Sequence, residues 1–289
     1  MVHLHRVDKI GSWSRQKLIL LGKYLETYTS ILNTPKNYSW FKGCYYIDAF
    51  AGSVTPWDKD AQEYIDGSPL VALKTIPSFN GFVFIEKDEK RLEGNIKPLI
   101  RAFPEKDIRV LPGDCNEILI TDILPKFLKS KGLRGFIFLD PYGLELCWDT
   151  VEAIGLAGVF DVFVNFSVMG VYRQLGNTPP PENVRATIDA VMGTKDWLPE
   201  AYQRSTQLTL SEEFSPRVER KNERLPERLT ECYRKQLKTC FAYVSKGIMM
   251  RNASGGPIYS LILASQKELA IKKMHDIFLR EEKRSKHTK

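Results

Sequence analysis

The chain has 289 residues, of which 43% are hydrophobic and 27% are charged. These values are typical of a globular protein and exclude a disordered or fibrous one. No apolar run approaches the roughly 20 residues that a membrane-spanning helix needs, and the N-terminus lacks the apolar core of a secretory signal. We therefore expect a cytoplasmic protein without membrane contact. The formal net charge of +7 favours polyanionic partners, of which nucleic acid is the most common.

The five cysteines are not spaced like the ligands of a metal site or the partners of a disulfide framework. No two of them form a CxxC pair, and their number is odd. A zinc ribbon, an iron–sulfur cluster and a disulfide framework are therefore unsupported, and we predict no metal site. Buried, reduced thiols are the simplest interpretation of these residues.

Short apolar runs alternate with helical patterns along the first 166 residues. An amphipathic helix is predicted over 13–32, because leucine and tyrosine recur there at three- and four-residue spacing. Five runs rich in β-branched and aromatic residues then predict buried parallel strands at 44–50, 81–85, 108–111, 135–139 and 161–166. Helices are predicted between them, from Ser68 and from Asp88 as N-caps, with a kink at Pro98, then over about 116–130 and from near Trp148. This alternation predicts a doubly wound α/β sheet.

The pattern changes after residue 170. Residues 171–225 contain three consecutive prolines and a mixed-charge run, which predict an inserted cap. A helix is predicted over 226–239, and the apolar runs 241–250 and 257–264 flank a turn rich in Asn, Ser and Gly, as in an antiparallel hairpin. A last helix is predicted over 266–281. The predicted organisation is an N-terminal helical extension (1–36), a core (37–170 plus 226–289) and the cap (171–225).

Acidic residues follow four consecutive predicted strands, at the edge where open parallel sheets bind ligands. Asp48 can accept hydrogen bonds from a cationic amine, Glu86 can bind two ribose hydroxyls, and Asp114 can accept an exocyclic amine such as that of adenine. Asp140 follows the fourth strand. The set suits a cationic nucleoside such as S-adenosylmethionine and suits pyrophosphate badly. Each carboxylate alone also has a simpler interpretation as a helix cap or turn former.

Two nucleotide-binding motifs are missing from the sequence. It contains neither GxGxxG nor GxxxxGK[ST]. A nicotinamide-dependent oxidoreductase is therefore disfavoured.

The segment Asp140-Pro141-Tyr142-Gly143 indicates amine chemistry. Proline has no N–H and keeps the preceding Asp140 extended. The Asp140 carboxylate and the Pro141 carbonyl can both accept hydrogen bonds from an NH₂ group, and Tyr142 can stack on a planar base. A proline turn with a packed tyrosine is the alternative interpretation.

Several motifs occur in the order found in one protein family. They are YIDAFAG at 46–52, GSPLVAL at 67–73, FIEKD at 84–88, GDCN at 113–116 and FLDPYG at 138–143. In these residues the chain resembles the three-Cys-motif partner proteins, which are methyltransferase-like. The Asp-Pro-Tyr segment is similar to the [DNS]PP[YF] motif of class I S-adenosylmethionine-dependent methyltransferases that act on amines.

The resemblance implies a Rossmann-like methyltransferase sheet with S-adenosylmethionine as cofactor. The resemblance implies a cofactor loop formed by Asp48, Ala49, Phe50 and Gly52. It implies that Glu86 binds the ribose, that Lys87 lies beside the adenine, and that Asp114 receives the adenine amine with Cys115 adjacent. It also implies that Asp140, Pro141 and Tyr142 face the methyl group and its acceptor. Two departures stand out. Ser53-Val54 replaces the usual continuation of the glycine motif, and the Asp-Pro-Tyr segment has a single proline.

The leading hypothesis is methyl transfer from S-adenosylmethionine to an exocyclic amine of a nucleic-acid base. Residues 171–225 are the candidate target-recognition segment. The alternative is a non-catalytic, methyltransferase-like partner subunit of a radical-SAM-like three-Cys-motif protein. The bulky Val54 beside the cofactor loop and the family's association with that partner motivate this alternative.

Overall fold

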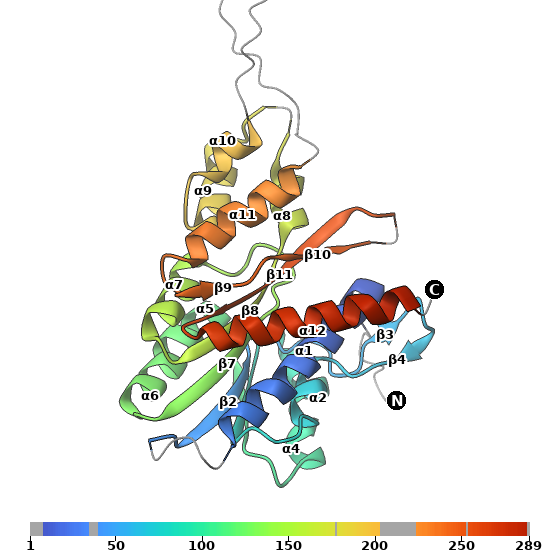
Figure 1. Ribbon diagram of the computed structural model, residues 1–289, viewed down its shortest axis with the longest axis vertical. Coiled ribbons are helices and arrows are strands. Elements are labelled where there is room, and N and C mark those ends of the chain that lie inside the picture. The colour runs from blue at the N-terminus through green and yellow to red at the C-terminus, as the bar shows by residue number, and fades with distance from the viewer. Residues whose placement is uncertain (1–7, 35–39, 177, 203–223, 253, 288–289) are drawn as a thin grey trace, which may run out of the picture.

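The structure, a computed structural model, describes residues 8–34, 40–176, 178–202, 224–252 and 254–287. Its centre is an eight-stranded sheet with helices on both faces (Figure 1). The strand order is β10-β11-β8-β7-β2-β5-β6, and β9 pairs with β11. The strands are β2 (Gly43–Asp48), β5 (Gly81–Glu86), β6 (Ile108–Pro112), β7 (Leu133–Leu139), β8 (Phe160–Phe166), β9 (Tyr243–Val244), β10 (Ile248–Arg251) and β11 (Pro257–Ser265).

The sheet is parallel except at the edge formed by the last strands of the chain, β9, β10 and β11. Strands β6, β5, β2, β7 and β8 run in one direction, whereas β11 is antiparallel to both β8 and β10. The parallel strands are apolar on both sides because helices cover both faces. This order confirms the predicted fold class of a doubly wound, mostly parallel, Rossmann-like sheet that ends in an antiparallel hairpin.

One predicted strand of the hairpin is divided in two. The run 241–250 forms β9 and β10, which pair with different parts of β11. Between them, the backbone N–H of Ser245 donates to the Leu263 carbonyl at 2.8 Å, and the Ser245 hydroxyl accepts from the Leu263 N–H at 2.9 Å. The side-chain bond replaces a ladder hydrogen bond at this point, so the strand continues after a short irregular step.

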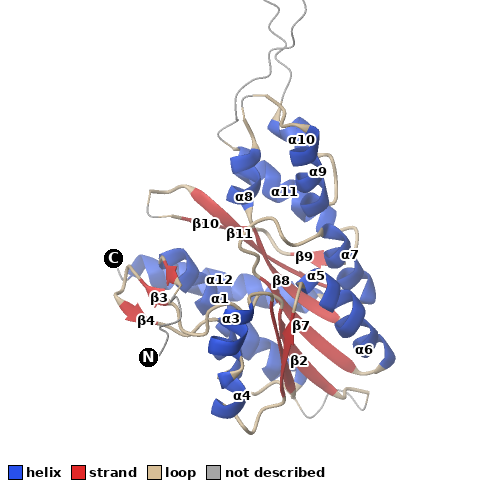
Figure 2. Ribbon diagram, turned by 180° about the vertical axis from the view of Figure 1, so that it is seen from behind, coloured by secondary structure: helices blue, strands red, loops and turns tan. Residues whose placement is uncertain are grey.

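Among the described residues, the first face of the sheet is covered by four helices, of which α1 and α12 come from the two ends of the chain. They are α1 (Ser12–Leu32), α2 (Ser68–Leu73), α4 (Pro98–Ala102) and α12 (Glu268–His287). Leu21 and Leu25 of α1 are fully buried, and the Tyr24 hydroxyl donates to the Asp161 carboxylate of β8 at 3.1 Å. Figure 2 shows α1 and α12 from behind the sheet. The described part of the predicted N-terminal extension thus packs as a layer of the main core.

The two helices that follow β5 and β6 each contain a π-helical turn. The first comprises α3 (Glu89–Arg91), η1 (Leu92–Ile96) and α4; the second comprises α5 (Cys115–Ile118), η2 (Leu119–Ile123) and α6 (Leu124–Lys129). Asp88 caps α3 as predicted, accepting from the Arg91 N–H at 2.9 Å. Pro98 lacks an N–H, and the preceding Lys97 N–H bonds to Leu92 five residues back. The predicted kink is therefore a π turn.

The predicted N-cap at Ser68 is wrong by one residue. Gly67 is the N-cap of α2, and Ser68 is its first helical residue. The Gly67 N–H donates to the Val54 carbonyl at 2.7 Å, and a Cβ on Gly67 would lie 2.1 Å from the Ser53 carbonyl oxygen. Only glycine fits this close approach, so the backbone of the preceding loop fixes the start of the helix.

The long segment between β2 and α2 folds onto the N-terminal residues. A three-stranded sheet forms from β1 (Lys9–Ile10), β3 (Trp57–Asp58) and β4 (Glu63–Tyr64), in which β1 and β3 are parallel. Arg15 of α1 pairs with Asp58 and Glu63. These contacts hold the N-terminal residues beside the carboxyl ends of the central strands.

The second face carries α5, α6, α7 (Trp148–Ala157) and a helical lobe. The lobe consists of α8 (Val168–Gln174), α9 (Glu182–Met192), α10 (Trp197–Ala201) and α11 (Leu225–Leu237), at the top of Figure 1. Of the predicted cap (171–225), the structure describes residues 171–176, 178–202 and 224–225. The rest of the cap, residues 177 and 203–223, lies outside the described residues. Because α11 packs against α8 and α10, a helix assigned to the core by sequence contacts the cap. The predicted domain boundaries stay predictions. None of the described helices has the length and apolar character needed to cross a bilayer.

Candidate functional site

Two adjoining cavities lie at the carboxyl ends of the parallel strands. The first has a volume of about 760 Å³ and is bounded by the N-terminal residues, α1, the loop after β2 and the loop after β7. The second has a volume of about 500 Å³ and lies over the ends of β2, β5 and β6. Phe50, Arg91 and Tyr142 line both cavities. The two cavities therefore adjoin at these three residues and together form one extended cleft.

The second cavity collects most of the predicted cofactor residues. Its lining includes Ala49, Phe50, Glu86, Lys87, Asp114 and Cys115. They come from three separate loops, after β2, β5 and β6, and the parallel strand order brings them together. This arrangement is consistent with the prediction from the sequence that these strand ends share one site.

Glu86 is held by backbone donors from two loops. Its Oε2 accepts from the Gly52 N–H at 2.9 Å, and its Oε1 accepts from the Asp88 N–H at 2.8 Å. The side chain is therefore fixed at the junction of these loops. A carboxylate oxygen has two lone pairs, so each Glu86 oxygen keeps acceptor capacity for a ligand in the second cavity.

Asp114 is both a helix cap and a cavity residue. Its Oδ1 accepts from the Asn116 N–H at 2.9 Å, and its Oδ2 lies 3.2 Å from Lys87 Nζ. Burial acts to raise the pKa of Asp114, but the hydrogen bonds from Asn116 and Lys87 outweigh it and hold the pKa below its usual value. Asp114 is thus an ionised acceptor at neutral pH. Both interpretations of this residue, cap and ligand acceptor, fit its position.

The thiol of Cys115 is a weak nucleophile. Burial is the main cause that raises its pKa to about 12, with a further contribution from Asp114. A protonated, buried thiol does not attack a substrate. In the described part of the chain, no group of three or more His, Cys, Asp or Glu residues is arranged to hold a metal ion.

Asp48 lines neither cavity, although it was predicted to bind the cofactor. Its side chain is fully buried and accepts from the Tyr46 hydroxyl at 3.0 Å and from the Phe50 N–H at 3.3 Å. Burial raises the pKa of Asp48 to about 7. The residue therefore supports the loop from behind, while Ala49, Phe50 and Gly52 form the surface that a ligand would meet.

The loop after β2 turns at Gly52, which has a φ of +51°. A Cβ at this position would lie 2.9 Å from the Tyr142 hydroxyl oxygen, so glycine suits both the turn and the close approach. Val54, the departure noted in the sequence, is buried in the core beneath the loop and lines neither cavity. The valine therefore does not obstruct the cleft.

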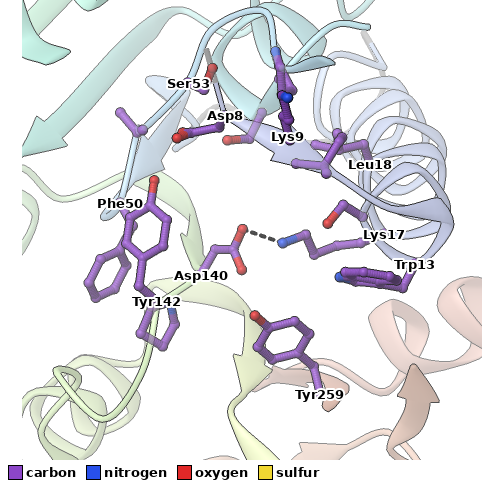
Figure 3. Close-up of a pocket in the computed structure, with 18 of the residues that line it drawn as sticks. Asp8, Lys9, Trp13, Lys17, Leu18, Phe50, Ser53, Asp140, Tyr142 and Tyr259 are labelled. Atoms are coloured by element: carbon purple, nitrogen blue, oxygen red, sulfur yellow. Dashed lines mark hydrogen bonds and ion pairs between the residues drawn. The ribbon is translucent and has the colours of Figure 1, made fainter. Parts of the chain in front are cut away.

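The three predicted catalytic residues line the first cavity together. Asp140, Pro141 and Tyr142 come from the turn after β7. Asp140 Oδ1 accepts from Asn165 Nδ2 at 2.6 Å, and Asp140 Oδ2 pairs with Lys17 Nζ of α1. Figure 3 shows this pair at the centre of the cavity, with Tyr142 and Phe50 on one side and Trp13 on the other.

Tyr142 is positioned by a cation. The Arg91 guanidinium lies 4.9 Å from the centre of the Tyr142 ring and also hydrogen-bonds the Tyr142 hydroxyl. Arg91 in turn pairs with Asp8 at 3.0 Å. The Tyr142 side chain nevertheless remains 59% exposed, so its ring remains accessible for stacking.

Sequence reasoning missed the contribution of the N-terminal residues and of β11. Asp8, Lys9, Trp13, Lys17 and Tyr259 all line the first cavity. One signal was present in the sequence. Lys17 precedes Leu21 and Leu25 by four and eight residues, so a charged residue stands on the apolar stripe of the helix. Such a residue needs a buried partner, which here is Asp140.

No protein-family model matches the chain, and no curated protein matches it. Similar solved structures include a protein named as the methyltransferase yhhF from Escherichia coli, at 13% identity and a TM-score of 0.33 over 85% of this chain and 87% of that one. Another is an O-methyltransferase from Bacillus cereus in complex with SAH, at 12% identity and a TM-score of 0.36 over 84% of this chain and 80% of that one. At these TM-scores the strand order remains the basis of the fold assignment. Membership of the three-Cys-motif partner family stays a prediction.

The burial of Asp48 predicts a pH-dependent stability. An unfolded aspartate is ionised above about pH 4, whereas folded Asp48 has a pKa of about 7. Between these values the folded state holds a proton that the unfolded state releases. The free energy of unfolding should therefore fall as pH rises through this window, by up to about 1.4 kcal/mol per pH unit. Asp48→Asn resembles the protonated acid and should remove this slope.

Urea unfolding at pH 5 and pH 8 measures the effect. The free energy of unfolding of Asp48→Asn minus that of wild type should be larger at pH 8 than at pH 5. Asp66→Asn is the control, because Asp66 is an exposed carboxylate paired with Lys74 and should show no such gain. Parallel pH profiles for wild type and Asp48→Asn would contradict the assignment of Asp48 as a buried, protonated support.

Proposed function

We propose that this protein is an S-adenosylmethionine-dependent methyltransferase that acts on an exocyclic amine of a nucleic-acid base. The observation that carries the proposal is the extended cleft. Glu86 and Asp114 lie in one cavity, Asp140 and Pro141 lie in the other, and Tyr142 lines both. In our proposal the cavity with Glu86 and Asp114 would hold the nucleoside, and the adjoining cavity would hold the amine.

The residues of the second cavity fit the cofactor. Glu86, fixed by two backbone donors, would accept from the ribose hydroxyls, and Asp114, ionised at neutral pH, would accept from the adenine amine. Lys87 and Cys115 would lie beside the adenine. The loop Ala49–Gly52, of which Ala49 and Phe50 line the second cavity and Gly52 lines the first, would support the amino-acid end. When bound, S-adenosylmethionine supplies a methyl group activated by a sulfonium.

The residues of the first cavity would orient the acceptor. The Asp140 carboxylate and the Pro141 carbonyl would accept hydrogen bonds from the amine and so aim its lone pair. Tyr142 would stack on the base, and Trp13 and Tyr259 supply further aromatic surface in the same cavity. A base within a duplex would have to flip out to reach this depth.

A nucleic-acid substrate is supported by charge. The chain carries a net charge of +7, and Lys9, Lys17 and Arg91 line the first cavity. Residues 171–225 remain our candidate target-recognition segment. This segment begins inside α8, the helix that follows β8, and it contains α9 and α10.

A second function is favoured by one observation. Asp140, which we propose accepts hydrogen bonds from the substrate amine, already has a cationic partner in Lys17. This occupancy suits the alternative prediction, a non-catalytic partner subunit of a radical-SAM-like three-Cys-motif protein. Such a subunit would bind the cofactor without transferring its methyl group by itself.

Cofactor binding can be measured by calorimetry with S-adenosylhomocysteine. Glu86→Gln and Asp114→Asn each remove a charged acceptor from the second cavity and should weaken binding about tenfold or more. Asp66→Asn, outside both cavities, should bind like wild type. Thermal unfolding of each variant identifies any loss of fold. If wild type shows no saturable binding, or if both cavity variants bind like wild type, the cofactor site is wrong.

Methyl transfer can be measured with radiolabelled S-adenosylmethionine and tRNA, rRNA or DNA. Asp140→Ala and Tyr142→Ala should lower transfer about a hundredfold, while affinity for S-adenosylhomocysteine changes little. Transfer that is unchanged in both variants would exclude these residues as the acceptor site. A wild-type chain that binds S-adenosylhomocysteine but methylates none of these substrates, and that co-purifies with a three-Cys-motif protein, would support the partner-subunit alternative.

A further inference from the structure

Lys17 is fixed in place by the fold, unlike most surface lysines. Its side chain is 11% exposed and projects from the part of α1 where Leu20 and Leu21 are fully buried. Its Nζ lies 6.0 Å from the centre of the Phe138 ring and 5.7 Å from that of Tyr259. At these distances the two rings attract an ammonium group. The ammonium is therefore a permanent part of the first cavity.

Both oxygens of Asp140 are engaged within the chain. Oδ2 pairs with Lys17 Nζ, and Oδ1 accepts from Asn165 Nδ2 at 2.6 Å. Figure 3 shows the lysine reaching the carboxylate from the far wall of the cavity. A ligand amine that approaches Asp140 therefore meets a carboxylate whose charge is already neutralised by a cation.

The charged groups of the cavity wall are paired in the same way. Asp8 pairs with Arg91 at 3.0 Å, and Asp140 pairs with Lys17. Lys9 adds a further positive charge to the lining. Among the described residues, the wall of this cavity thus has three cations and two anions. A second cation at Asp140 is repelled, whereas a neutral N–H donor can still share the remaining lone pairs of the carboxylate.

We propose that Lys17 is a specificity-determining residue that selects a neutral exocyclic amine over a protonated alkylamine at Asp140. The proposal rests on the proposed function, because it concerns the same acceptor site. An alkylammonium ion has no free lone pair and would block Asp140 without accepting a methyl group. The amines of nucleic-acid bases are uncharged at neutral pH. Lys17 thereby allows the neutral amine of a base, which can react, to bind at Asp140 and disfavours a protonated alkylamine, which cannot react.

The test compares two ligands that differ in charge at the reacting position. Sinefungin carries a protonated amine in place of the methyl group that S-adenosylmethionine transfers, and this position would lie next to the methyl acceptor and therefore near Asp140. S-adenosylhomocysteine carries a neutral thioether there. Calorimetry gives the affinity of each ligand for wild type, Lys17→Met and Lys17→Arg. In Lys17→Met, Asp140 loses its cationic partner, and the preference for sinefungin over S-adenosylhomocysteine should rise about tenfold or more. Lys17→Arg keeps the charge and should retain the wild-type preference.

Further variants separate this role from a structural one. A general loss of packing would change both affinities alike and leave their ratio unchanged. If Lys17→Met folds poorly, Lys17→Gln keeps a neutral hydrogen-bond donor and should show the same rise in the ratio. In an Asp140→Asn background, removal of Lys17 should give no gain for sinefungin, since the carboxylate is absent.

Two negative results have different meanings. An unchanged ratio in Lys17→Met and Lys17→Gln, with S-adenosylhomocysteine still bound, would overturn the role of Lys17 and leave the proposed function intact. A wild-type chain that binds neither ligand would overturn the proposed cofactor site and the role of Lys17 together.

Discussion

The parallel alignment of β6, β5, β2 and β7 is the constraint on which the site depends. It brings the ends of these strands to one edge, so that Glu86, Asp114 and Asp140, far apart in sequence, line adjoining cavities. The Gly52 N–H, which donates to Glu86, ties two of the loops at this edge. α1 and the segment after β2 then close the cleft from the side, through β1, β3 and the Arg15 ion pairs.

Much of the fold could be predicted because its signals are local. The five parallel strands are apolar runs bounded by polar turns, and Asp88 caps its helix as the sequence indicates. The errors occur where a distant contact decides. The N-cap of α2 is set by the approach of Gly67 to the Ser53 carbonyl. The break between β9 and β10 depends on hydrogen bonds between Ser245 and Leu263.

The candidate site could be predicted from the strand ends but not from the chain's long-range contacts. Strand-end position alone cannot separate Glu86, which lines a cavity, from Asp48, which is enclosed by Tyr46 and its own loop. Lys17 lies 123 residues from Asp140 in sequence. Only the packing of α1 on the sheet reveals that the Asp140 carboxylate is paired with a cation. On this contact rests our proposal that the site discriminates among amines instead of attracting any amine.

A crystal structure with S-adenosylhomocysteine bound would show whether this cleft is the cofactor site. We expect the adenine beside Asp114, the ribose hydroxyls on Glu86, and the thioether end extending past Tyr142 toward Asp140 in the first cavity. A ligand bound elsewhere on the sheet, or one whose ribose makes no contact with Glu86, would contradict the assignment of this cleft as a methyltransferase site.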